Sequence, residues 1–195
     1  EWQRLEAVGE SAPAAVALRG ELHLVARASD GTLRHRVRGA GGWSEAATLP
    51  LPATVDDPAL VAMGARLVLV ARTAAGELLG ATRSAERWTA LPAPLALGVA
   101  GAPVALAAAP DRLRVLFTDR SGGVSKLELA LAGDLPAPAK PQPLGGEGLA
   151  GTVVALGDGR HTRLLADAPN GNRFGALLPV GAAPGPLWWT FGGRW

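Results

Sequence analysis

PAAVALRGELHLVARASDGTLRHRVRGAGGWSEAATLP, residues 13–50, decides the fold, because a second copy of this stretch begins 45 residues later, at Pro58. So many matches at one offset are hard to obtain by chance. A sequence that repeats itself at a period of this length is typical of solenoids, propellers and arrays. The residues that match at this offset are Leu22 and Leu67, Leu24 and Leu69, Val25 and Val70, Arg27 and Arg72, Gly31 and Gly76, Leu33 and Leu78, and Trp43 and Trp88.

The order of apolar and turn residues within the unit predicts four short antiparallel strands. Residues 22–27 are largely apolar, and Asp30 and Gly31 form a turn pair that readily adopts positive φ and closes hairpins. Residues 33–38 alternate arginines with leucine, histidine and valine, which places the two groups on opposite faces of a strand. Residues 43–49 supply the last strand. Four strands in about 45 residues is the length of one β-propeller blade.

Two further copies follow with weaker similarity. The third begins at Pro103 with one inserted residue, and a proline-rich stretch, 135–143, stands where a tryptophan strand is expected. The sequence therefore predicts an all-β chain, a propeller-like array of four-stranded antiparallel blades with one extra N-terminal strand at 2–5. We expect one propeller-type domain or a fragment of one. The predicted blades cover about 13–50, 58–94, 103–146 and 151–193.

Composition narrows the alternatives. Glycine and proline interrupt every window long enough for a helix, which argues against a helical repeat of similar period. The 195 residues contain no cysteine, so packing alone must hold the chain, and the net charge of +2 comes from no basic tract. The stretch 89–110 carries no charge, but it contains 4 prolines and is not expected to span a membrane. We expect an inter-blade loop there, followed by the first strand of the third blade.

Three segments of the first unit resemble a known family. They are LHLVAR at 22–27, SDGTLRH at 29–35 and GGWS at 41–44. Together they resemble the bacterial PLL-like, fucose-binding lectin propellers. The resemblance is close in the first blade, moderate in the second and weak in the third and fourth. The family closes as rings of seven blades. Four repeats therefore predict a part of a longer chain, a smaller ring, or a ring shared between chains.

The resemblance implies a sugar bound between neighbouring blades, on a surface rich in tryptophan. An indole ring offers a flat apolar face to the C–H side of a pyranose. This sequence keeps one tryptophan in each of its first two blades and lacks further tryptophans where family members often have them. Packing and ligand contact therefore both remain open for these side chains. The candidate ligand-binding residues are Trp43, Ser44, Trp88, Thr89, Arg27, Arg72 and Trp189.

No constellation for catalysis or metal binding is visible. The histidines His23, His35 and His161 lack the spacing of metal ligands, and no nucleophile elbow occurs. We expect His35 to be packed or hydrogen-bonded rather than a ligand or a base. The three arginines at 34, 36 and 38 lie on one strand face without interleaved aromatics, so a solvated face is favoured over a nucleic-acid site.

The sequence thus favours a non-enzymatic, lectin-like module that recognises a deoxy or methylated sugar between blades, without a cofactor or a metal. The alternative is a structural or protein-docking propeller that has lost its sugar sites and belongs to a longer chain or an assembly. The expected partners are a glycan or a protein, with no nucleic acid and no membrane insertion. The resemblance further implies a secreted or cell-surface location.

Overall fold

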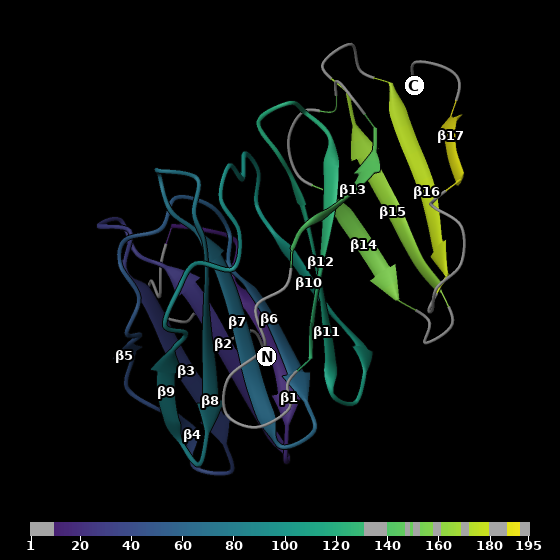
Figure 1. The fold of residues 1–195 in the computed structure, drawn as a ribbon. Helices are drawn as coiled ribbons and strands as arrows, with labels where there is room; N and C mark the ends of the chain where they lie inside the picture. Colours follow the sequence, from purple (N-terminus) through teal and green to yellow (C-terminus); the bar gives the residue numbers. More distant parts are fainter. Residues whose placement is uncertain are drawn as a thin grey trace.

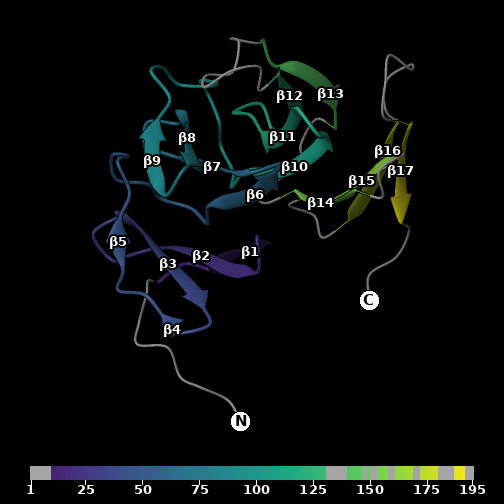
Figure 2. The same ribbon diagram turned by 90° about the horizontal axis from the view of Figure 1, so that it is seen from below.

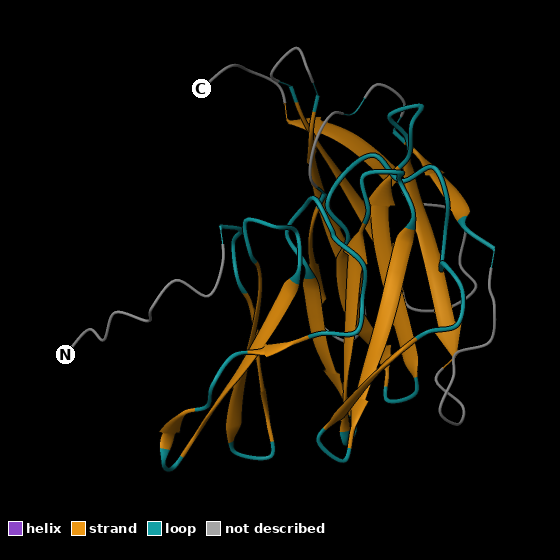
Figure 3. Cartoon of the chain, turned by 90° about the vertical axis from the view of Figure 1, so that its left-hand side faces the viewer, coloured by secondary structure: helices purple, strands orange, loops and turns teal. Residues whose placement is uncertain are grey.

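The computed structural model describes residues 10–130, 140–146, 149, 153–157, 161–168, 172–179 and 187–191. Within these ranges the chain forms strands and no helix (Figures 1 and 3). Four antiparallel sheets follow one another along the sequence, and their strands pair in chain order, except that the two short last strands of the first sheet both pair with its third strand. Consecutive short strands joined by tight turns produce this meander, as the repeated turn signals predicted.

The strands fall into four blades, as the fold prediction required. The first blade contains β1 (Ala14–Leu18), β2 (Glu21–Arg27), β3 (Leu33–Gly39), β4 (Gly42–Trp43) and β5 (Ala47–Thr48). The second contains β6 (Ala59–Met63), β7 (Arg66–Arg72), β8 (Leu78–Ser84) and β9 (Arg87–Ala90). The third contains β10 (Val104–Ala109), β11 (Arg112–Thr118), β12 (Val124–Ala130) and β13 (Gln142–Gly145). The fourth contains β14 (Val154–Gly157), β15 (His161–Asp167), β16 (Arg173–Pro179) and β17 (Leu187–Phe191).

The first strand of each blade is the innermost one. β1 contacts β6, β6 contacts β10, and β10 contacts β14. Figure 2 shows the blades following one another along an arc, with the first and fourth blades at its two ends. This arrangement is that of a β-propeller, in which the blades pack face to face around a common axis.

Apolar side chains fill the space between neighbouring blades. Val25 and Leu33 of the first blade pack against Leu69, Ala71 and Ala81 of the second. Comparable buried clusters join the second blade to the third and the third to the fourth. Each blade therefore buries one face against the next blade, and the strand alternation seen in the sequence sets which residues do so.

A recurring glycine links each blade to the loop that leads into the next. Gly31, Gly76 and Gly122 have φ values of 83°, 81° and 79°. The carbonyl of each accepts a backbone hydrogen bond from that loop, the donors being the amides of Thr54, Val99 and Leu149. The aligned glycines of the sequence repeat thus serve both the hairpin turn and the attachment of the next blade.

Replacing Gly31 with alanine should lower the free energy of unfolding by about 2–3 kcal/mol, because an L side chain is strained at this φ and because its Cβ would lie 2.9 Å from the Cβ of Ala53. Gly20 provides a matched control. Its φ is +81°, but a Cβ there would meet nothing within 4 Å. Gly20→Ala should therefore cost only about 1–2 kcal/mol. Urea denaturation measures both, and equal losses would show that the loop contact contributes nothing.

The last strand of the first blade departs from the prediction. Residues 43–49 do not form one strand, because β4 and β5 pair separately with β3. The hydroxyl of Ser44 accepts the hydrogen bond of the Val37 amide at 3.0 Å and donates to the carbonyl of Glu45. A side chain thus replaces a backbone partner in the ladder, and the strand is interrupted there.

The third blade closes as expected without a tryptophan. β13 pairs with β12 at the outer edge, where Pro143 is tolerated because an edge strand needs no second ladder. The predicted extra strand at 2–5 lies outside the described residues.

Candidate functional site at the blade junctions

The third residue of each second strand distinguishes the junctions between blades. His23 occupies this place in β2, Val68 in β7 and Arg114 in β11. All three side chains are buried. Each lies on the face that packs against the following blade, so this one position gives the three junctions different chemistry.

The junction of the first and second blades holds two buried histidines and a tryptophan. His23 Nδ1 lies 3.1 Å from His35 Nε2, and the two rings are stacked with centroids 5.3 Å apart. Trp88 of the second blade donates its indole N–H to His35 Nδ1 at 3.2 Å. The expectation that His35 is packed and hydrogen-bonded is therefore confirmed.

Burial controls the protonation of both imidazoles. It lowers the pKa of His35 to about 4, and the nearby charges of Arg83 and His23 act in the same direction. The pKa of His23 is also lowered, by burial first and by Arg83 second, against the opposing effect of Glu21. Both rings are therefore mainly neutral at pH 7, and the positive charge next to them is that of Arg83.

The junction of the second and third blades is apolar at the same position. Val68 and Val70 pack there against Leu113, Val115 and Phe117. At this position the junction offers apolar packing, and Thr82 lies opposite Val68 on the neighbouring strand.

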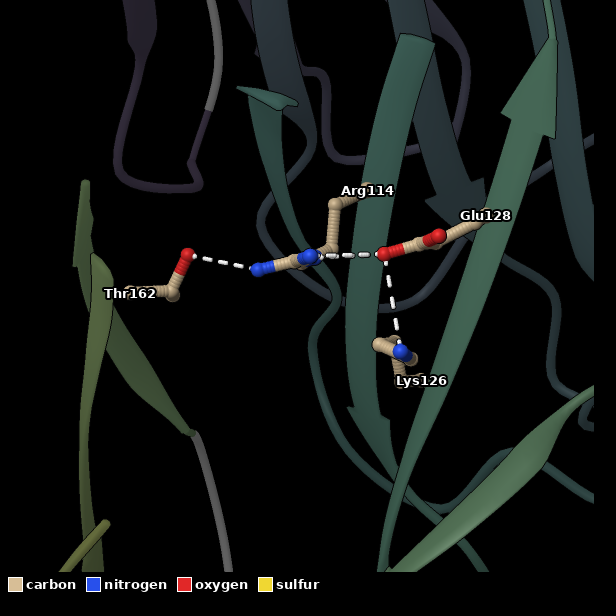
Figure 4. A network of polar contacts seen from close by, with 4 residues as sticks. All are labelled: Arg114, Lys126, Glu128 and Thr162. Carbon is tan, nitrogen blue, oxygen red and sulfur yellow. Dashed lines mark hydrogen bonds and ion pairs between the residues drawn. The ribbon is translucent and has the colours of Figure 1, made fainter. Parts of the chain in front are cut away.

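The junction of the third and fourth blades contains a charged network (Figure 4). Arg114, only 2% exposed, donates from Nε and Nη2 to Glu128 Oε1 at 3.0 and 2.6 Å. Its Nη1 donates to Thr162 Oγ1 of the fourth blade at 3.0 Å. Lys126 Nζ lies 3.5 Å from the same Glu128 oxygen. We call these four residues the Arg114 network.

Glu128 meets the cations of the Arg114 network through a single carboxylate oxygen. Every contact between Glu128 and its cations uses Oε1, and Oε2 has no hydrogen-bond partner within the described part of the chain. The side chain of Glu128 is 29% exposed and that of Lys126 is 17% exposed, whereas Arg114 lies beneath them.

Glu128 is a carboxylate at neutral pH. Burial alone would raise its pKa, but the hydrogen bonds from Arg114 and the charge of Lys126 outweigh burial and lower it. A fixed carboxylate oxygen beside an ammonium group can bind a pair of hydroxyl groups on a small ligand.

The sequence-predicted residues are not brought together into one site. Trp43 is half-buried on the face of the first blade that points away from the second, where the Arg36 guanidinium lies 5.8 Å from its ring centroid. Trp88 lies in the junction of the first two blades. Ser44 bonds the backbone of its own strand. Thr89 is exposed on β9.

The two repeated arginines serve the loops that enter the blades. Arg72 pairs with Asp56, and its carbonyl accepts the Val55 amide, so it fixes the loop between the first and second blades. The backbone carbonyl of Arg27 likewise accepts a hydrogen bond from the Glu10 amide. The side-chain Nε of Arg27 is buried and has no hydrogen-bond partner in the part of the chain that is described. Trp189 lies in β17, where its backbone pairs with Gly175. The ligand-binding role of these residues stays a prediction.

Sequence reasoning missed the Arg114 network. The signal was present, because Arg114 interrupts the apolar run 113–117 and Glu128 follows on the other side of the turn at 121–123. Aligning the two strands across that turn pairs Arg114 with Glu128, as the structure does. The contact between Arg114 and Thr162 could not be found by aligning the strands of one hairpin, because the two residues lie in different blades.

Two further findings concern the described residues only. No group of three or more histidine or acidic side chains is placed to hold a metal ion there. The same residues include no helix long and apolar enough to cross a membrane.

Comparisons with known proteins identify the fold. No family model matches the chain, and no curated protein is similar to it in sequence. Among solved structures, the BP39L lectin from Burkholderia pseudomallei has a TM-score of 0.75 at 18% identity, with 91% of this chain and 55% of that chain covered. The SapL1 lectin in complex with alpha methyl fucoside has a TM-score of 0.63 at 18% identity, covering 95% of this chain and 63% of that one.

A fungal lectin from Aleuria aurantia, described as a six-bladed β-propeller with a novel fucose recognition mode, has a TM-score of 0.62 at 14% identity. The match covers 92% of this chain and 62% of that one. The chain therefore spans less than two thirds of the solved lectins that it resembles. At these identities the similarity establishes a shared propeller fold.

Proposed function

We propose that the protein is a non-enzymatic carbohydrate-binding propeller whose principal site is the Arg114 network. The observation that carries the proposal is the Glu128 carboxylate, which is held by Arg114 and leaves Oε2 without a partner among the described residues. The similarity to a lectin in complex with alpha methyl fucoside and to a fungal propeller lectin that recognises fucose supports a sugar as the ligand class.

The surroundings of the network suit a deoxy or methylated sugar. Leu106 pairs with Arg114 across β10 and β11 and is half-buried beside it, and Val104 lies on the same face. Glu128 and Lys126 would take ring hydroxyls, while these apolar side chains would take a methyl group or a deoxygenated carbon. We retain the tryptophans Trp43 and Trp88 as candidate secondary contacts.

Replacing Lys126 with methionine tests the polar half of the site. The substitution keeps the aliphatic stem and the Arg114–Glu128 pair but removes the ammonium donor. Affinity for a sugar detected on a glycan array should fall at least about tenfold, because a charged hydrogen bond contributes roughly 1.5–3 kcal/mol. Lys140, an exposed lysine outside the junction, gives the control Lys140→Met. Equal affinities of both variants would contradict the assignment.

A second candidate function is a propeller that docks a protein. It is favoured by three large apolar side chains on β14 and β15 that are exposed, namely Val154, Leu156 and Leu165. It also fits the engagement of the Trp88 indole by His35 within the chain. A stable complex in gel filtration together with no binding on the array would favour this function over the first. Both proposed functions keep the prediction that the protein forms an oligomer or is part of a longer chain.

A further inference from the structure

The junction of the first and second blades contains a chain of hydrogen bonds with a direction. It runs from Trp88 to His35 and from His35 to His23, and His23 Nε2 lies 3.6 Å from Glu21 Oε2. Glu21 reaches the surface, whereas His23 is 1% exposed and His35 is 4% exposed. The chain therefore joins a buried contact between blades to the solvent.

The indole fixes the tautomers. Trp88 can only donate, so His35 Nδ1 must be bare. A neutral His35 then carries its hydrogen on Nε2 and donates to His23 Nδ1. His23 in turn carries its hydrogen on Nε2, directed toward Glu21. One neutral arrangement satisfies the whole chain.

An added proton has no place in this arrangement. A proton on His35 Nδ1 would meet the indole N–H. A proton on His23 Nδ1 would meet the N–H of His35, and moving that hydrogen to His35 Nδ1 would recreate the first conflict. Protonation of either ring therefore breaks either the hydrogen bond from Trp88, which connects the two blades, or the bond between the two histidines, which holds His35 in place within the first blade.

We propose that His23, His35 and Trp88 form an acid-sensitive latch between the first and second blades, closed at neutral pH and opened when the histidine pair takes up a proton. The ionisable groups that face the pair are Glu21 from β2, Arg83 from β8 and the rings themselves. Arg83 opposes the added charge, whereas Glu21 favours it at His23. The latch does not use the Arg114 network, so it stands or falls independently of the proposed sugar site.

The direction of the pH dependence follows from burial. An unfolded or opened histidine titrates near 6.5, and His35 in the closed junction has its pKa lowered to about 4. The opened state therefore binds more protons over this interval, and the latch weakens as the pH falls from about 6.5 to about 4. Between pH 7 and pH 4 the opening equilibrium should rise on the order of 100-fold.

Hydrogen exchange of the Trp88 indole N–H tests the proposal. After correction for the intrinsic exchange rate, its protection should fall on the order of 100-fold from pH 7 to pH 4. A glutamine amide can accept with its oxygen and donate with its nitrogen but does not titrate. The variant His23→Gln/His35→Gln should therefore remove most of the pH dependence, while the control His161→Gln in the fourth blade should keep the wild-type response. Unchanged wild-type protection at pH 4, or an equal loss in the double glutamine variant, would overturn the latch.

A direct reading of the tautomers keeps the test decisive even if the double variant fails to fold. Nitrogen-15 NMR of the wild-type protein at pH 7 should show both histidines neutral and protonated on Nε2. A hydrogen on Nδ1 of His35 at pH 7 would refute the proposal on its own.

Discussion

Replacing Glu128 with leucine should lower the free energy of unfolding by about 3–5 kcal/mol, one of the two largest effects expected in this protein. The reason lies in the partner. Arg114 is 2% exposed and cannot lose its charge, so removal of Glu128 leaves a buried guanidinium without its counter-ion. Thermal or urea unfolding measures the loss.

The double variant Arg114→Met/Glu128→Leu separates a buried charge from simple packing. It removes both charges and keeps most of the volume, so its stability should lie within about 1–2 kcal/mol of the wild type. Asp167 offers a control, because its ion pair with Arg173 is exposed on both sides and Asp167→Asn should cost less than about 1 kcal/mol. If Glu128→Leu lowers the free energy of unfolding no more than this control does, the buried Arg114 guanidinium does not need Glu128 as its counter-ion.

Replacing Trp88 with alanine should lower the free energy of unfolding by about 3 kcal/mol. The indole packs with Leu69 and Ala81 in the cluster between the first two blades and donates to His35, so truncation removes apolar contacts and leaves a buried acceptor unpaired. Trp88→Phe keeps much of the packing and should cost about 1–2 kcal/mol.

Trp43 is the matched comparison, because it occupies the same position in the preceding repeat. It packs against no described blade, and its described ring contact is the Arg36 guanidinium. Trp43→Ala should therefore cost about 1 kcal/mol. Equal losses at Trp43 and Trp88 would mean that the contact across the junction adds nothing to the stability of Trp88.

The repeat made the architecture predictable from the sequence. The 45-residue offset places Gly31 and Gly76 at equivalent turns, and each turn holds the loop to the next blade by the same backbone bond. Local alternation in 33–38 likewise predicted the two faces of β3, on one of which Leu33 and His35 are buried. The interruption at Ser44 was not predictable, because it depends on a hydroxyl replacing one backbone acceptor.

The candidate site was harder to predict because it depends on contacts between blades. A tryptophan at the same place in two repeats indicates a shared position but does not say what the indole touches. In the structure the Trp88 N–H meets a histidine from the neighbouring blade, 53 residues away in the sequence. The Arg114–Glu128 pair lies within one hairpin and was within reach, but its contact with Thr162 spans 48 residues.

Calorimetric titration of the full chain with alpha methyl fucoside, beside the Glu128→Gln variant, tests the central claim most directly. Glutamine keeps the shape of the side chain and an oxygen for Arg114 but removes the carboxylate, and unfolding of the variant is measured alongside to confirm that it is folded. The account predicts saturable binding by the wild type that weakens at least tenfold in the folded variant. No binding at millimolar fucoside, or equal binding by both proteins, would contradict it.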